Sequence, residues 1–226
     1  MKKITHYYIL LFFLLFIIGF NKTAFSQDSL LRKPKHIIGY AIQRTPNTAK
    51  YEGHAESSAT YKTPNYNLFY RFLMPVDTNW MTAFTASFDY RRGHGYSYNG
   101  GRGGGSSVSG DFEFCRLGLG VSPQRRYGKH KNFVFGGGFN LGYLIYAKGN
   151  IKRHNFSQGI ATDSEESAYN VISKMYVSLN FEISQAFKIS SKKYLILGVK
   201  QYFESPDYTG TRLNLTTSLF LACNLR

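Results

Sequence analysis

The chain has 226 residues, and its 28 basic and 13 acidic side chains give a formal net charge of +15 at pH 7. This length fits one all-β domain or two small domains and excludes neither. The positive charge attracts polyanions. Because the N-terminus has an export signal, anionic lipid head groups or polysaccharide are more plausible polyanions than nucleic acid. Scattered surface lysines and arginines explain the charge equally well.

The N-terminus has the features of a secretory signal peptide. Its start is basic, residues 7–20 form an almost unbroken apolar run, and Ala24 and Ser26 supply small side chains at the two positions that a signal peptidase reads. The run has 14 residues, fewer than the roughly 20 that a membrane-spanning helix needs. We therefore predict a cleaved signal peptide at residues 1–26 and a polar periplasmic leader at residues 27–35.

The last segment, residues 211–226, alternates between apolar and polar side chains. Successive side chains of a strand point to opposite faces, so this segment is one long β-strand with an apolar face and a polar face. An ordinary strand has about five or six residues, whereas a tilted membrane-crossing strand needs about nine to eleven. The length therefore indicates a transmembrane strand. Its apolar face carries Leu213, Leu215, Leu219, Leu221 and Leu225.

Seven further segments show a similar alternation and bring the total to eight, an even number, as a single-chain bacterial barrel requires. Long and short connections alternate until the last one, which is the pattern of extracellular loops and periplasmic turns. The additional strands are expected at about 36–44, 66–74, 80–91, 111–121, 132–146, 173–187 and 194–203.

The strand at 111–121 gives conflicting signals about which face points outward. Phe112 and Phe114 favour the even positions, while Leu117 and Leu119 favour the odd ones. An arginine on the lipid face costs about 2 to 4 kcal/mol at mid-depth, so Arg116 is placed inside. The two phenylalanines are then expected inside or above the bilayer, or beside a β-bulge.

The long connections at 45–65, 92–110 and 147–172 are expected to be extracellular loops. Residues 93–110 are so rich in glycine and serine that we expect a mobile surface loop. They lack the Gly-Lys-Ser/Thr ending of a phosphate-binding loop.

On this pattern, residues 36–226 resemble the small eight-stranded bacterial outer-membrane barrels, a family that includes the OmpA membrane domain and OmpX. The resemblance implies a location in the bacterial outer membrane, contact with its lipid and lipopolysaccharide, and insertion by the barrel-assembly machinery. One feature departs from the family. Its members usually end in an aromatic residue that this machinery recognises, whereas this chain ends in Asn224, Leu225 and Arg226.

The interior of an eight-stranded barrel is only wide enough for side chains to fill it. Charges inside must therefore pair or meet water, because an unpaired buried charge is very costly. We interpret the inward-facing set as a salt-bridge plug with Glu182 among the arginines, with a narrow ion path or gate as the alternative. The predicted lumen network is Arg71, Asp89, Arg116, Asn140, Lys174, Glu182, Lys200 and Arg212.

The sequence indicates no catalytic, cofactor or metal site. The histidines fall in separate segments without metal-ligand spacing. One enzymatic alternative is a lipid A deacylase, because those enzymes are also eight-stranded barrels with a histidine and a serine two apart on a strand near an acid. Here His154 and Ser157 are three apart in a predicted loop, with Glu165 and Glu166 further on.

A soluble lipocalin-like barrel is the other alternative, with its apolar face inside. The glycine, serine, asparagine and charged residues opposite the apolar faces are a poor lining for an apolar cavity. The sequence thus predicts an all-β, eight-stranded antiparallel up-and-down transmembrane barrel without catalytic activity. Its loops are expected to mediate any binding, and the candidate roles are adhesion, docking of a protein partner in an envelope assembly, or membrane integrity.

Overall fold

The computed structural model describes residues 35–52, 55–62, 64–101, 104–127, 132–157, 160–190, 193–207 and 213–225. The predicted signal peptide, nearly all of the leader and Arg212 lie outside these residues. The elements are β1 Lys35–Arg44, β2 Thr48–Glu52, β3 Ala55–Tyr61, β4 Asn65–Pro75, β5 Trp80–Gly101, β6 Gly104–Tyr127, β7 Phe133–Ser157, β8 Ile160–Glu166, α2 Ala168–Val171, β9 Met175–Lys188, β10 Tyr194–Glu204 and β11 Asn214–Leu225.

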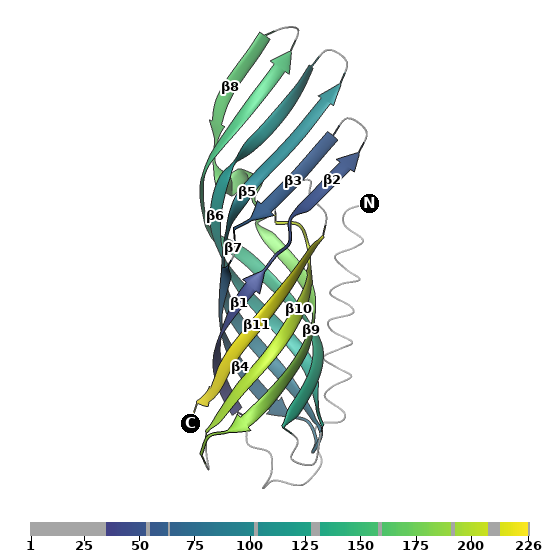
Figure 1. The fold of residues 1–226 in the computed structure, drawn as a ribbon, viewed down its shortest axis with the longest axis vertical. Coiled ribbons are helices and arrows are strands. Elements are labelled where there is room, and N and C mark those ends of the chain that lie inside the picture. Colours follow the sequence, from purple (N-terminus) through teal and green to yellow (C-terminus); the bar gives the residue numbers. More distant parts are fainter. Residues whose placement is uncertain are drawn as a thin grey trace.

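Eight of the strands close into an antiparallel barrel in the order β1, β4, β5, β6, β7, β9, β10 and β11 (Figure 1). The last strand pairs with β10 and also with β1, from His36↔Leu225 to Arg44↔Thr217. The predicted eight-stranded fold is therefore confirmed. None of the helical segments in the described ranges has the length and apolar character that a membrane-spanning helix needs.

The outward-facing side chains form an apolar belt around the barrel. On β11, for example, Leu219 is 63% exposed while the adjacent Ser218 is 1% exposed. Ile38 and Ile42 on β1 and Leu119 on β6 are exposed in the same way. Exposed apolar surface on this scale would be unfavourable in water, so the belt marks the part of the barrel that contacts lipid.

Strands β5, β6 and β7 are 22, 24 and 25 residues long, far beyond the roughly 9 to 11 residues that cross a bilayer. Their distal halves continue past the barrel and join β2, β3 and β8 in a six-stranded sheet, here called the extension (Figure 1). The prediction of three loops was therefore wrong. Residues 93–101 and 104–110, expected to be mobile, pair with each other as far as Gly101↔Gly104 and are flanked by β3 and β7.

Along β6 the even-numbered residues from 112 to 118 face inward without interruption. The conflicting signals about which face of this strand points outward are thereby resolved. Phe112, Phe114 and Arg116 are all buried on the inner face, and Leu117 and Leu119 are exposed on the outer face. The irregularity lies in the neighbouring strand β7, where the register shifts between the partners of Cys115 and Arg116. The two phenylalanines lie above the lipid belt and belong to a core at the base of the extension.

Candidate functional site

The lumen is crossed in its lower half by an ion pair between two opposite strands. Arg71 on β4 donates two hydrogen bonds to the carboxylate of Glu182 on β9, each 2.8 Å long. The order of strands places three strands between β4 and β9 on either side of the barrel. Lys200 Nζ lies 3.9 Å from the same carboxylate, and Ser184 Oγ donates to it at 3.3 Å. The pair therefore bridges the full width of the barrel.

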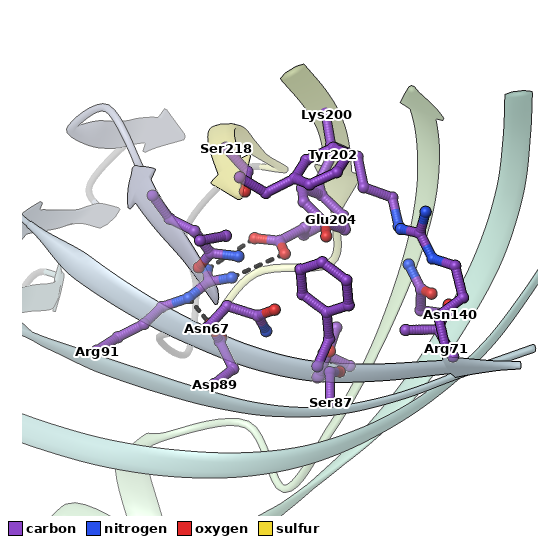
Figure 2. Close-up of a pocket in the computed structure, with 16 residues that line it drawn as sticks. Asn67, Arg71, Ser87, Asp89, Arg91, Asn140, Lys200, Tyr202, Glu204 and Ser218 are labelled. Atoms are coloured by element: carbon purple, nitrogen blue, oxygen red, sulfur yellow. Dashed lines mark hydrogen bonds and ion pairs between the residues drawn. The ribbon is translucent and has the colours of Figure 1, made fainter. Parts of the chain in front are cut away.

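A second cross-barrel cluster is centred on Arg91 (Figure 2), and this side chain is buried, with 1% exposure. From β5 it donates to both carboxylate oxygens of Glu204 on β10, at 2.7 and 2.8 Å. It also donates to Asp89 at 2.8 Å and to Asp207 at 3.0 Å. Strands β5 and β10 are again opposite each other in the barrel, so this cluster also spans the lumen.

Asp207 ties the connection after β10 to this cluster. Its carboxylate accepts hydrogen bonds from Arg116 and, at 2.9 Å, from the hydroxyl of Tyr61 on β3. Burial by itself would raise the pKa of Asp207, but Arg116 and Arg91 outweigh burial and hold the pKa below its ordinary value. Burial and the neighbouring Asp207 raise the pKa of Tyr61 well above its usual value, so the tyrosine remains a donor at neutral pH.

The two clusters balance each other in charge and leave little space between them. Four cationic side chains, Arg71, Arg91, Arg116 and Lys200, face four acidic ones, Asp89, Glu182, Glu204 and Asp207. The cavity between the clusters is about 20 Å³ and is lined by both of them, which is room for about one water molecule. This arrangement forms a plug of paired charges.

Apolar layers lie beyond both ends of the plug. The layer below it contains Ile37, Leu73 and Val134 among others. The layer above it is the core at the base of the extension, where Phe112 and Phe114 pack with side chains of β3, β7 and α2. The sequence did not reveal this core, because six of its nine buried residues come from segments that were expected to be loops.

Six of the eight side chains predicted for the lumen are buried in it. Five belong to the ionic clusters, and the sixth is Asn140, which donates to Ser178 Oγ at 3.1 Å. The prediction that Lys174 faces the lumen was wrong. This residue precedes the first residue of β9, so strand alternation does not place it, and its exposed ammonium lies 5.2 Å from the centroid of the Tyr169 ring. The predicted position of Arg212 lies outside the described residues.

Three charged members of the plug were missing from the predicted network. Arg91 shares the inner face of its strand with Asp89, and alternation could have added it. Glu204 is one residue past the predicted end of its strand, in phase with Lys200. Asp207 lies in a connection, where no periodic pattern applies, and only the three-dimensional structure reveals it.

The residues of the enzymatic alternative lie in the extension. His154 contacts the carboxylate of Asp163 across β7 and β8, and its ring packs edge-on against Phe156. Ser157 is three positions along the same strand, an odd separation that places it on the other face. Glu165 is opposite Lys152. Within the described part of the chain, no group of three or more His, Cys, Asp or Glu side chains is arranged to hold a metal ion.

A closed eight-stranded barrel with an apolar belt outside and paired charges inside is a transmembrane barrel of the outer-membrane type. A lipocalin-like barrel has the opposite arrangement and is excluded by these faces. The protein is therefore a small bacterial outer-membrane barrel. By the rule that such barrels have short periplasmic turns and long extracellular connections, the end with Lys35 and Leu225 faces the periplasm.

Comparison with solved structures finds barrels of the same kind. The chain is similar to the attachment invasion locus protein Ail of Yersinia pestis (15% identity, TM-score 0.37, covering 84% of this chain and 95% of that one). It is also similar to Neisserial surface protein A (11%, 0.41, 85% and 98%) and to OprG of Pseudomonas aeruginosa (13%, 0.46, 85% and 96%). No family model matches the sequence, and neither does any curated protein. Because identities and TM-scores are low, the fold assignment rests on the strand pairing described above.

Proposed function

We propose that this barrel is a non-enzymatic docking protein whose extension binds a protein partner outside the cell by strand addition. The observation that carries the proposal is the pair of open edges. Among the described residues, β2 pairs only with β3, and β8 pairs only with β7. An edge strand presents unpaired backbone N–H and C=O groups, which an extended segment of another protein can satisfy.

The attachment of the extension to the barrel supports docking, because it presents the open edges on a firmly anchored sheet. Its three long strands are continuous with the barrel wall, so the sheet is not a flexible appendage. The apolar core at its base contains Tyr61, Phe112 and Ile151, all at most 5% exposed. A preformed sheet loses less conformational entropy on binding than a mobile loop would. For the barrel itself we propose lipid, lipopolysaccharide and the assembly machinery as partners.

Crosslinking in intact cells tests the docking proposal. A photoreactive amino acid in place of Thr162, an exposed residue of β8, is expected to capture a discrete protein partner. The same amino acid in place of Leu119, in the lipid belt, is the matched control and should capture none. Ala161→Pro should abolish the adduct, since proline disrupts strand pairing, while the barrel keeps its heat-modifiable electrophoretic mobility. Identical adduct patterns at both positions would refute docking at this edge.

A further inference from the structure

The periplasmic end of the lumen contains a pocket that the plug does not fill. This vestibule has a volume of about 300 Å³, at the lower end of the range of roughly 300–1,000 Å³ for small-molecule sites. Every one of the eight barrel strands, or the residue just before it, contributes to its lining. Arg71 lies at its inner end, where the pairing with Glu182 closes the lumen. The vestibule is thus a pocket with one open end.

The described residues that line the vestibule include cations and no carboxylate. Arg126 on β6 donates through Nε and Nη2 to the thioether sulfur of Met81, at 3.3 and 3.1 Å, and has no acidic partner among the described residues. Lys35 Nζ lies 5.1 Å from the centroid of the Tyr194 ring, also without an acidic partner in the described part of the chain. Within the described ranges, two positive charges therefore face the pocket without a compensating carboxylate.

Buried hydrogen-bond donors at the same place also lack acceptors. Gln124 is 1% exposed and lines the vestibule, yet its Nε2 has no partner among the described residues. Arg71 is 4% exposed, and its Nε likewise has no hydrogen-bond partner among the described residues. A buried donor without an acceptor costs about 1–3 kcal/mol, and most such groups in proteins are satisfied by some partner. The missing partner here is an acceptor, and the excess positive charge favours an anionic one.

The remaining wall of the vestibule is apolar. Ile37, Leu73, Val134 and Ile196 come from four different strands and surround the same space. An inorganic anion would satisfy the donors but leave this surface in contact with water. An apolar chain that ends in an oxyanion matches both parts of the lining.

From this combination we infer that the vestibule binds an amphipathic monoanion of the fatty-acid class, with its carboxylate between Gln124, Arg126 and Lys35 and its chain against the apolar wall. The site is separate from the docking edge of the extension and does not depend on it. Because the plug closes the inner end, the ligand enters and leaves from the periplasmic side.

Nuclear magnetic resonance of the barrel in lipid nanodiscs tests the site directly. Sodium octanoate is the probe, and the side-chain amide signals of Gln124 report binding. Saturable shifts are expected with octanoate, whereas octanol, which lacks the charge, and acetate, which lacks the chain, should give much weaker ones. Equal shifts with octanol or with acetate would overturn the inference, and so would the absence of any shift, which would mean that water alone occupies the vestibule.

Two neighbouring arginines on β6 provide matched variants. Arg126→Gln removes a charge from the vestibule and should weaken octanoate binding about tenfold, the loss expected for a hydrogen bond to a charged group. Arg125→Gln changes the adjacent residue, whose guanidinium lies over the rings of Trp80 and Tyr127 on the outer face, and should leave binding unchanged. Equal effects of the two variants would contradict the inference. If Arg126→Gln does not fold, Lys35→Gln replaces it.

Discussion

At the scale of single residues, Glu182 is the side chain on which the lower half of the plug depends. It is 1% exposed and accepts from Arg71 while Lys200 lies 3.9 Å away. Glu182→Gln keeps the shape but removes the only negative charge that the described residues place against these cations. Removing one partner of a buried ion pair costs about 3–5 kcal/mol, and we expect a loss of that size in the free energy of unfolding, measured with urea in lipid vesicles.

The matched control for Glu182→Gln is the double variant that also carries Arg71→Met. With the main cation gone, the neutral amide that replaces the carboxylate has only the Lys200 ammonium nearby, so part of the lost stability should return. An unfolding free energy that is unchanged in the single variant would show that the pair does not stabilise the barrel.

Asp207 should make the stability of the upper cluster dependent on acid. Its pKa in the folded protein is below the ordinary value of 3.8 because of Arg116 and Arg91. The folded state therefore binds this proton less readily than the unfolded state, and the stabilisation is complete above pH 3.8 and is lost as the pH falls through the folded pKa. Asp207→Asn should be less stable than the natural protein at pH 7, and the difference should shrink below about pH 4. A difference in melting temperature that stays constant down to about pH 2.5 would contradict this.

At the scale of elements, several glycines of the extension are a condition for strand pairing, because they let neighbouring backbones approach closely. A Cβ atom at Gly110 would lie 2.0 Å from the backbone oxygen of Asn150 on the neighbouring strand. Gly110→Ala should therefore separate β6 from β7 in the extension and speed its cleavage by added protease. Gly101→Ala is the control, because a Cβ there would meet nothing within 4 Å. Equal protease resistance in both variants would show that the close approach is not needed.

The same glycines explain why the barrel could be predicted from the sequence and the extension could not. In the barrel, lipid outside and packed side chains inside impose a period of two that is visible along β9 and β11. In the extension, pairing rests on backbone hydrogen bonds and close approaches, for which glycine and serine suffice, and these residues also compose mobile linkers. The role of Asp207 could not be predicted from the sequence either, because it lies in a connection and its partners come from strands that are distant along the chain.

At the scale of the whole molecule, the protein is a stack of layers along the barrel axis. From the periplasm outward these are the vestibule with its apolar wall, the two ionic bridges, the core under the extension and the extension itself. The bridges join opposite walls, so each resists ovalisation of the cylinder as well as the passage of water. The layers that close the lumen are therefore also the ones that hold its shape.

The apolar belt surrounds these layers. If it contacts lipid, the cost of a charged substitution in the belt should depend on its depth in the bilayer. Leu119 is 71% exposed on β6, opposite Ala86 on one side and Leu141 on the other, near the middle of the belt. In a bilayer, Leu119→Arg should lower the free energy of unfolding by about 2–4 kcal/mol, whereas Leu225→Arg at the periplasmic end should cost about 0–1 kcal/mol. Both leucines are exposed in the isolated protein, so a barrel surrounded by water would tolerate both changes equally. Unfolding in lipid vesicles distinguishes the two cases, and equal, small effects at both positions would contradict the assignment of this surface to lipid.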